Sequence, residues 1–266
     1  MGFTPHTEEP DTPPRSKTVL VVGSCGRMGT MLAKRLAQAK YTVYGTDPAA
    51  RASSPDSGAA LPALLKKVSI VLLCVPVGAM RLCLRELAPL LEPTHLLMDI
   101  TSVKTLPLAW MEKAFSGPVV GAHPMFGPQP LSKNMRVALV KASAAGAADC
   151  TDAARLFTDM GCQVFWTDAA THDAGVAMSQ SLAFTISSAF FALLADQKDI
   201  APYLTPSFKR YMEAARMHLT TDKDMFLEFG AMNPELPGAV EAFRQSLDAA
   251  VQNPVAMAAK AAQWYR

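Results

Sequence analysis

Short apolar runs alternate with amphipathic segments in the first part of the chain. Residues 18–22 form a run rich in β-branched side chains that ends at Gly23, which is the pattern of a buried parallel strand. Residues 27–40 carry apolar side chains at helical spacing, and residues 41–45 again resemble a strand. The order strand, helix, strand over this length predicts one βαβ unit.

The same alternation continues along the chain. Further strands are predicted at residues 68–75, 95–99, 118–121, 135–141 and 163–167, and helices at residues 78–91, 106–115 and 147–160. Strands that alternate with helices indicate a parallel sheet that is covered on both faces. We therefore expect an α/β fold of the Rossmann type, with a doubly wound sheet.

The pattern changes after residue 168. Residues 172–194 carry small and apolar side chains on nearly every side of a helix, among them Ala174, Ala177, Ser181, Ala183, Ser187 and Ala189. A helix of this kind is expected to be buried on every side. Helices are also predicted at 207–218, 225–229 and 238–250, and no strand is predicted after Thr167.

Three regions follow from these patterns. Residues 1–16 are polar and proline-rich and predict a disordered tail, residues 17–168 a dinucleotide-binding Rossmann domain, and residues 169–266 an all-α dimerisation and substrate domain. The all-round apolar helix is hard to bury within one short helical domain. Two copies packed together would bury it, so we expect a homodimer joined through the helical domain.

Composition narrows the range of partners and compartments. Half of the 266 residues are hydrophobic and 18% are charged, which is sufficient for a large core. No uninterrupted apolar run reaches the ~18 residues of a spanning helix, and the start has no signal-peptide pattern. With 25 basic and 23 acidic residues, a net charge of +2 and no dense basic block, nucleic acid and membrane are poor candidates for partners. Five scattered cysteines indicate reduced thiols, and we expect a cytoplasmic protein that acts on a small molecule.

A glycine-rich segment joins the first predicted strand to the first predicted helix. It reads Gly23-Ser24-Cys25-Gly26-Arg27-Met28-Gly29. Gly26 would let the backbone approach a pyrophosphate, and Gly29 would let the helix pack on the sheet. The helix N-terminus would supply N–H groups for the phosphates. A tight turn without a ligand is the alternative, but the place at the first strand–helix junction favours a nucleotide site.

Asp47 follows the second predicted strand. A carboxylate there accepts hydrogen bonds from the adenosine ribose hydroxyls and repels a 2′-phosphate, which favours NAD over NADP. The alternative is a turn residue, because Asp47-Pro48 is a common turn opener. Arg51 is close in sequence and could weaken the discrimination.

Two further segments follow the ends of later strands, where open α/β sheets bind their ligands. The first, residues 99–104, contains Ser102 and Lys104, and the second, residues 121–128, contains His123. His123 is placed just past the end of a predicted strand, and histidine is suited to taking up a proton near neutral pH. A lone histidine is more often structural, but this position favours catalysis.

Four motifs together resemble the prephenate dehydrogenase family of tyrosine biosynthesis. They are Val-Gly-x-x-Gly-x-Met-Gly at 22–29, Asp-Ile-Thr-Ser-Val-Lys at 99–104, His-Pro-Met-Phe-Gly-Pro at 123–128, and the His172-Asp173 pair with Gln180. The resemblance runs from about residue 17 to residue 250, and the histidine-proline motif is its most specific part.

The resemblance implies an NAD-dependent oxidative decarboxylation that needs no metal. His123 would take the proton of the ring hydroxyl as hydride leaves for NAD, and Ser102 would help hold that hydroxyl. Gln180 would line the site from the long helix. Independently of the resemblance, the position of Lys104 past a strand end would let it bind one substrate carboxylate. A dimer joined through the helical domain is also implied.

Two positions depart from the family pattern. A histidine that usually lies one turn beyond the glutamine is replaced here by Phe184, for which simple core packing is the alternative. An arginine that grips the ring carboxylate in the family falls on Met217. Arg216 is then the first candidate for this carboxylate, followed by Lys209 and Arg210, and a solvated surface residue is the alternative reading of Arg216.

Other functions are compatible with parts of this pattern. A dehydrogenase for a related ring, such as arogenate or an amino-substituted prephenate, would explain the two departures. A non-catalytic NAD-binding relative would also explain them, but the intact Ser102, Lys104 and His123 oppose it. A β-hydroxyacid dehydrogenase would carry a catalytic lysine on its long helix, and residues 172–194 contain none.

Overall fold

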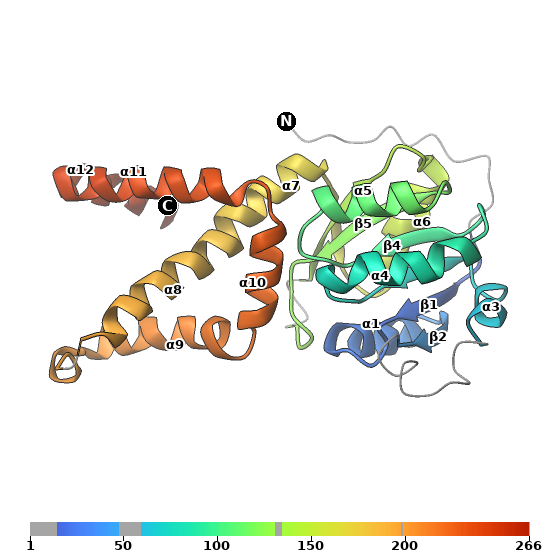
Figure 1. Ribbon diagram of the computed structural model, residues 1–266, viewed down its shortest axis with the longest axis horizontal. Coiled ribbons are helices and arrows are strands. Elements are labelled where there is room, and N and C mark those ends of the chain that lie inside the picture. The colour runs from blue at the N-terminus through green and yellow to red at the C-terminus, as the bar shows by residue number, and fades with distance from the viewer. Residues whose placement is uncertain (1–14, 48–59, 131–134, 198, 266) are drawn as a thin grey trace. The chain divides into compact units, whose positions relative to one another are not determined.

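The two faces of one sheet hold most of the buried apolar side chains of this protein. The computed structural model describes residues 15–47, 60–130, 135–197 and 199–265 (Figure 1). The chain divides into an α/β unit and a helical unit between His172 and Asp173. The elements up to the division are β1 Thr18–Val22, α1 Arg27–Gln38, β2 Thr42–Thr46, α3 Ala60–Leu65, β3 Ile70–Leu73, α4 Val77–Leu87, the 3-10 turn η2 Ala88–Leu90, β4 Leu96–Asp99, α5 Thr105–Ala114, β5 Val119–Pro124, β6 Arg136–Lys141, α6 Ala147–Thr158, β7 Gln163–Trp166 and α7 Ala169–Val176, whose second half lies beyond the division.

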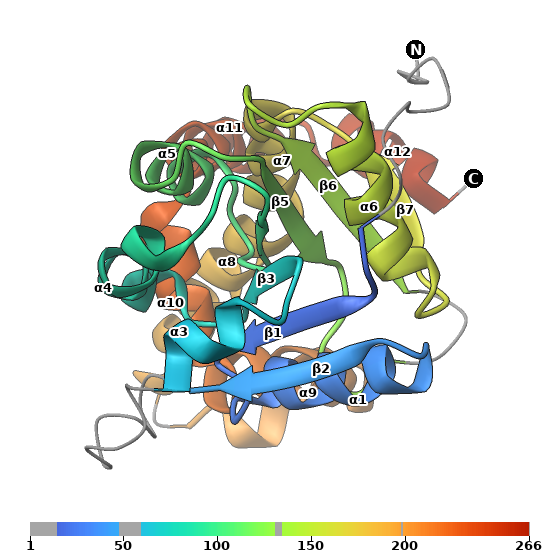
Figure 2. The same cartoon turned by 90° about the vertical axis from the view of Figure 1, so that its right-hand side faces the viewer.

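The seven strands form a doubly wound sheet, as the sequence predicted. Their order is β2-β1-β3-β4-β5-β6-β7, and all neighbours are parallel except β5 and β6 (Figure 2). Because β2 and β3 lie on opposite sides of β1, the connections diverge at the carboxyl end of β1. Open α/β sheets bind ligands in the crevice at such a switch point.

Alternate residues of each strand face opposite layers of helices. Val19 and Val21 of β1 pack with buried residues of α1 and α6, whereas Leu20 and Val22 pack with α3, α4 and α5. Figure 2 shows α4 and α5 on one side of the sheet and α6 on the other. The strands are therefore apolar on both faces, as parallel strands between two helical layers must be.

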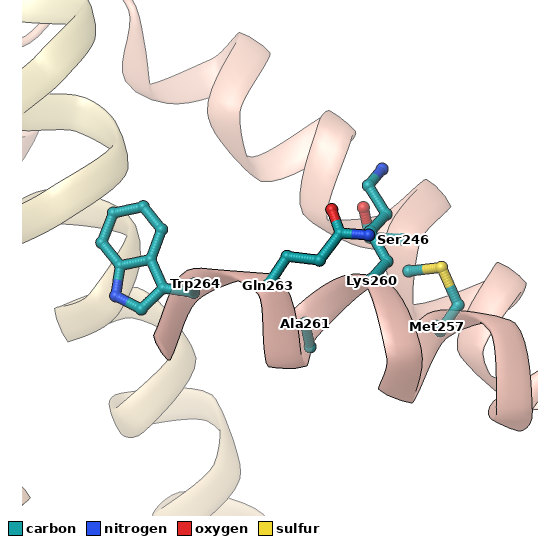
Figure 3. Close-up of a pocket in the computed structure, with 6 residues that line it drawn as sticks. All are labelled: Ser246, Met257, Lys260, Ala261, Gln263 and Trp264. Atoms are coloured by element: carbon teal, nitrogen blue, oxygen red, sulfur yellow. The ribbon is translucent and has the colours of Figure 1, made fainter. Parts of the chain in front are cut away.

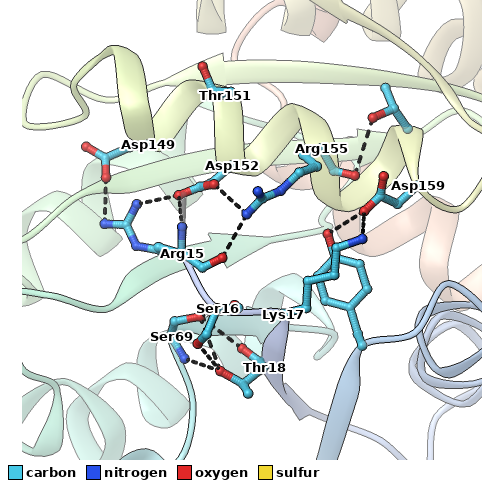
Figure 4. Close-up of polar contacts among 12 residues, drawn as sticks. Arg15, Ser16, Lys17, Thr18, Ser69, Asp149, Thr151, Asp152, Arg155 and Asp159 are labelled. Carbon is cyan, nitrogen blue, oxygen red and sulfur yellow. Dashed lines mark hydrogen bonds and ion pairs between the residues drawn. The ribbon is translucent and has the colours of Figure 1, made fainter. Parts of the chain in front are cut away.

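Arg15 and Ser16 correct the predicted extent of the disordered tail. The Arg15 guanidinium lies 2.6 Å from an Asp149 carboxylate oxygen and 3.2 Å from one of Asp152, both on α6 (Figure 4). Arg155 donates hydrogen bonds to the Arg15 carbonyl at 2.9 Å and to Asp152 at 2.7 Å. The polar composition suggested disorder, but acidic residues one helical turn apart hold this segment on α6. Residues 1–14 of the predicted tail lie outside the described residues.

The helical unit packs through aromatic side chains. After α7 it contains the π-helical turn η3 Ala177–Ser181, α8 Leu182–Ala195, η4 Ala201–Tyr203, α9 Pro206–Thr220, α10 Lys223–Met232, α11 Leu236–Gln252, α12 Pro254–Ala262 and η5 Gln263–Tyr265. Phe190 of α8 contacts Phe208 and Tyr211 of α9 edge-on, with ring centroids 6.1 and 5.9 Å away. Within its described residues the unit has no strand, in agreement with the predicted all-α character.

The helix formed by α7, η3 and α8 is long and apolar. It covers 27 residues, Ala169–Ala195, with a mean hydropathy of 1.5 in its most apolar stretch, of which 28% is buried. By length and composition alone it could cross a membrane, but core helices of soluble proteins meet the same criterion. Counting uninterrupted apolar residues misses this helix because hydroxyl groups interrupt the run. The hydroxyls of Ser179 and Thr185 donate hydrogen bonds to main-chain carbonyl oxygens one turn earlier, at 2.7 and 2.9 Å.

Candidate active site

The turn from β1 to α1 requires glycine at two positions. Gly23 has a φ of +88°, and a Cβ there would lie 2.5 Å from the carbonyl oxygen of Cys74. A Cβ on Gly29 would lie 2.1 Å from the carbonyl oxygen of Gly23. Main-chain segments therefore touch where any side chain would hold them apart, as the glycine motif predicted.

The outer part of this loop faces solvent. Cys25, Gly26 and Arg27 are exposed, and Ser24 and Met28 are half-buried. Gly26 is the N-cap of α1 and contributes no side-chain cap. The first turn of a helix in this arrangement presents N–H groups and a partial positive charge, which suit the phosphates of a dinucleotide.

Asp47 lies against the loop from the end of the neighbouring strand. One of its carboxylate oxygens accepts a hydrogen bond from the Cys25 N–H at 3.1 Å. The carboxylate is half-buried beside the glycine loop, which is where an acidic residue can reach a ribose in this fold. Arg51, the neighbouring cation noted in the sequence, lies outside the described residues.

A fully buried ion pair ends β4. Lys104 Nζ lies 2.6 Å from an Asp99 carboxylate oxygen and donates to the Ala122 carbonyl oxygen at 2.7 Å. The Thr101 amide and hydroxyl donate to the same Asp99 oxygen. The sequence identified Lys104 as a substrate ligand without foreseeing Asp99 as its partner. The hydrogen bond to Ala122 connects Lys104 to β5, the strand that carries His123. Ser102 is half-buried in the loop after β4.

His123 lies inside β5, which corrects its predicted place just after a strand. The predicted strand ended at residue 121, but β5 continues to Pro124 because the antiparallel strand β6 pairs with it further than β4 does. Pro124 is tolerated as the last paired residue because a strand terminus does not require its missing N–H. His123 pairs with Ala138 of β6 and is 4% exposed, so its imidazole is held in a buried position.

A second histidine contacts His123. His123 Nδ1 lies 3.0 Å from His172 Nε2, and the two rings meet edge-on with centroids 5.2 Å apart. His172 is on the first turn of α7 and is also buried. In the sequence, the His172-Asp173 pair stands out only as part of the family resemblance. The signal that could have identified it is a histidine on the first turn of the helix that follows the last strand.

The other predicted site residues belong to the helical unit. Gln180 is half-buried in η3, and π-helical turns occur frequently at functional sites. Lys209 and Arg216 are both exposed on α9. Arg216 forms a surface ion pair with Glu213, with 2.9 Å between Nε and the carboxylate oxygen.

The two departures from the family pattern differ in their surroundings. Phe184 is buried and stacks on Phe226, with centroids 5.3 Å apart, and Phe226 also contacts His218 at 4.7 Å. Phe184 therefore packs in the core of the helical unit. Met217 is 55% exposed on α9.

Comparisons with known proteins agree with this architecture. The chain is 36% identical to the T-protein of Enterobacter agglomerans over 115 residues, which are 43% of this chain and 29% of that protein. It is 32% identical to the T-protein of Haemophilus influenzae over 109 residues, 41% of this chain and 27% of that protein. The chain thus matches less than a third of the length of these curated relatives.

Two solved structures share the fold. A prephenate dehydrogenase from A. aeolicus, in complex with hydroxyphenyl propionate and NAD⁺, superposes with a TM-score of 0.75 at 23% identity and covers 96% of each chain. Synechocystis arogenate dehydrogenase superposes with a TM-score of 0.72 at 20% identity, covering 88% of this chain and 91% of that one. The family model described as "Prephenate dehydrogenase, nucleotide-binding domain" matches residues 32–165. The chain therefore belongs to the prephenate dehydrogenase family, with which it shares the nucleotide-binding domain.

Proposed function

We propose that this chain is an NAD-dependent dehydrogenase that converts prephenate to 4-hydroxyphenylpyruvate by oxidative decarboxylation. The observation that carries the proposal is the buried His123, which is held near the carboxyl edge of the same sheet whose first strand ends in the glycine loop. A base and a nucleotide loop at one sheet edge are what hydride transfer coupled to proton removal requires. The A. aeolicus relative, solved with NAD⁺ and a phenolic acid, supports this reading.

The residues around the loop fit NAD. Gly23 and Gly29 leave no room for side chains inside the turn, and at Gly26 α1 begins without a side-chain cap, which is where the backbone would approach the pyrophosphate. The Asp47 carboxylate would accept hydrogen bonds from the hydroxyls of the adenosine ribose. NAD, when bound, would supply the hydride acceptor.

The protein's own residues would govern the proton and the orientation of the ring. His123 would accept the proton of the ring hydroxyl, and Ser102 would help hold that hydroxyl. Gln180 would line the site, and Arg216 or Lys209 would bind the ring carboxylate. Loss of carbon dioxide would follow from the gain of aromaticity, without a metal or a separate acid.

Prephenate and arogenate differ in one side chain, and an assay separates them. NADH formation would be followed at 340 nm with each compound at matched concentrations. We expect the higher kcat/KM with prephenate. A higher value with arogenate would favour the related-ring alternative, which the replacement of two family residues by Phe184 and Met217 supports. No NADH with either compound, in a chain that binds NAD, would indicate a non-catalytic relative.

Asp47 should determine cofactor choice. In Asp47→Ser the charge that repels a 2′-phosphate is absent, so the preference for NAD over NADP should narrow. The ratio of the two Kd values, measured by fluorescence titration, tests this. A wild-type protein that already prefers NADP would contradict the role of Asp47.

We also propose that the helical unit forms a homodimer. Within its described residues many large apolar side chains are exposed, including Leu193, Tyr203, Val251, Val255, Trp264 and Tyr265. Figure 3 shows Trp264 at one end of a shallow pocket that Ser246, Met257 and Lys260 also line. An obligate homodimer interface is apolar in this way. Light scattering at micromolar concentration should give twice the 28.5 kDa of one chain, and a stable monomer would refute the proposal.

A cytoplasmic location fits the same reading. All five cysteines are free thiols, as expected in a reducing compartment. Recovery of the protein in the membrane fraction of cells would contradict this location. The apolar helix Ala169–Ala195 would then be the candidate membrane segment.

A further inference from the structure

We propose that His172 is a positioning residue that sets the tautomer and orientation of His123. This inference rests on the proposed function, in which His123 is the base. It is carried by the 3.0 Å contact between His123 Nδ1 and His172 Nε2, with both rings buried.

The contact determines which nitrogen of His123 carries out proton transfer. Nδ1 is engaged by His172, so transfer from a substrate hydroxyl falls to Nε2. A neutral imidazole can accept at Nε2 only when its hydrogen is on Nδ1. His172 must then accept that hydrogen at its own Nε2. In this arrangement, with His123 Nδ1–H as the donor, the pair holds His123 in the tautomer in which it is a base, in the way that a carboxylate orients the histidine of a catalytic triad.

His172 is itself held by the start of α7. The Asp168 carboxylate accepts the Thr171 N–H at 2.8 Å and the Thr171 hydroxyl at 2.6 Å, and the Asp168 carbonyl accepts the His172 N–H at 2.9 Å. These hydrogen bonds hold the pKa of Asp168 below its usual range, so the cap is charged at neutral pH. An aspartate N-cap fixes the first helical turn, and with it the place from which His172 reaches β5.

A neutral acceptor matters most at the moment of proton transfer. When His123 becomes positively charged, its Nδ1–H donates more strongly, so the hydrogen bond to His172 stabilises the protonated form. Among the described residues, charged groups near the pair include Asp168 at the start of α7 and Asp173, which follows His172 in the chain. They also include Lys104, which donates to the carbonyl oxygen of Ala122 next to His123, and its partner Asp99. Asp99 and Lys104 form an ion pair, which limits their net effect on the histidines.

Two substitutions at position 172 separate positioning from packing. In His172→Leu the acceptor is absent, and kcat should fall on the order of 10- to 100-fold with little change in KM or in the Kd for NAD. The acid limb of the pH profile of kcat should move down by about one unit, because protonated His123 is no longer stabilised. In His172→Gln the amide oxygen lies near the former Nε2 and should restore most of kcat and the position of the limb.

A third variant controls for the loss of any buried histidine. His95 is 4% exposed and bonded to the backbone, with Nε2 3.0 Å from the Leu65 carbonyl oxygen. His95→Gln should lower the melting temperature without moving the acid limb. If His172→Leu behaves like His95→Gln, with an unmoved limb and unchanged kcat, the positioning role is wrong.

A measurement without substrate keeps this inference apart from the proposed function. Long-range ¹H–¹⁵N spectra of the wild-type protein should show that the hydrogen of the His123 ring is on Nδ1. The His123 signals are assigned by their absence from the spectrum of His123→Asn. The titration midpoint of His123 should fall by about one pH unit in His172→Leu. An Nε2–H tautomer would overturn the inference. A protein with the expected spectra but no dehydrogenase activity would overturn the proposed function alone.

Discussion

The α/β unit and the helical unit solve the problem of burial differently. In the α/β unit, fully buried charges such as Asp99 and Lys104 are paired, and apolar side chains fill both faces of the sheet. In the helical unit, Trp264 and Tyr265 are 87% and 89% exposed, and most of the apolar stretch of α7–α8 is uncovered within one chain. One chain thus buries most of the apolar surface of the α/β unit, whereas the helical unit leaves apolar surface exposed, which the proposed homodimer would cover. Substitutions of the buried polar groups of the α/β unit should accordingly have the largest effects.

The largest effect is expected at His123. In His123→Asn, turnover should fall by 10²–10⁴, about the contribution of a positioned acid–base group, while the Kd for NAD stays near the wild-type value. Steady-state NADH formation and a fluorescence titration measure the two quantities. A variant that retains more than half of the wild-type turnover would show that His123 is not the base, and the residue that takes up the proton would then have to be sought elsewhere.

Lys104 tests whether the buried charges of the α/β unit are mutually dependent. Lys104→Met leaves the Asp99 carboxylate buried without its cation, which should lower the free energy of unfolding by about 3–5 kcal/mol. The double variant Lys104→Met with Asp99→Asn removes both charges and should recover part of this loss. Urea unfolding measures both. A single variant as stable as the wild type would contradict the structural role of the pair and would favour the predicted contact of Lys104 with substrate.

Arg216 tests whether the helical unit contributes to substrate binding. If Arg216 pairs with the ring carboxylate, Arg216→Ala should raise KM ten- to hundredfold, equivalent to about 1.5–3 kcal/mol, with the Kd for NAD unchanged. Arg244, which also forms an exposed ion pair three residues back along a helix, with Glu241, is the matched control. Equal KM values for both variants would mean that Arg216 is only a surface residue and that another cation, Lys209 first, takes the role.

The smallest effect is expected where Lys17 holds the start of β1. The Lys17 hydrogen bond, at 2.7 Å, is the main cause that lowers the pKa of Asp159, so this stabilisation is present above about pH 4 and is lost as pH falls through the lowered pKa. Lys17→Met should cost less than ~1 kcal/mol at pH 7, because the pair is partly exposed. Urea unfolding at several pH values should show that the difference in unfolding free energy between the wild type and Lys17→Met becomes smaller in acid. A difference that does not change with pH would exclude the ionised Asp159 as its cause.

Tyr41 extends this test to high pH. Burial, and then the hydrogen bond to Asp159, raise its pKa from 10.0 to about 12. The contribution of the neutral phenol is therefore complete below pH 10.0 and is lost as pH rises through about 12. Tyr41→Phe should remove this alkaline dependence of stability.

The order of elements was predictable because hydrophobic periodicity reports burial directly. Strands β1, β3 and β4 and helices α1, α4 and α5 follow from it within a few residues. The short helix α3 was missed because six residues give too little periodicity, and the alanine-rich α12 because it shows no buried stripe. The end of β5 was misplaced because its last residues pair with β6, a partner that local sequence does not reveal.

The candidate site was predictable where a local motif determines it. Gly23 and Gly29 follow from a backbone turn that has no room for side chains. The partner of His123 could not be read in the same way, since His172 reaches it only through the packing of α7 near β5. Asp99 lies in the same short segment as Lys104, but the conformation of the loop between them decides that they pair. Side-chain pairing across a sheet edge depends on tertiary structure, so sequence named the chemical groups but not their orientation.

The exposed thiol of Cys25 makes the glycine loop open to selective labelling. Cys25 is the one exposed cysteine among the five, whereas burial raises the pKa of the Cys74, Cys150 and Cys162 thiols and keeps them in the unreactive protonated form. Because the Cys25 amide is hydrogen-bonded to Asp47, a maleimide dye attached here would be next to the residue expected to bind ribose. One native cysteine thus offers a spectroscopic reporter of cofactor occupancy without engineering the rest of the chain.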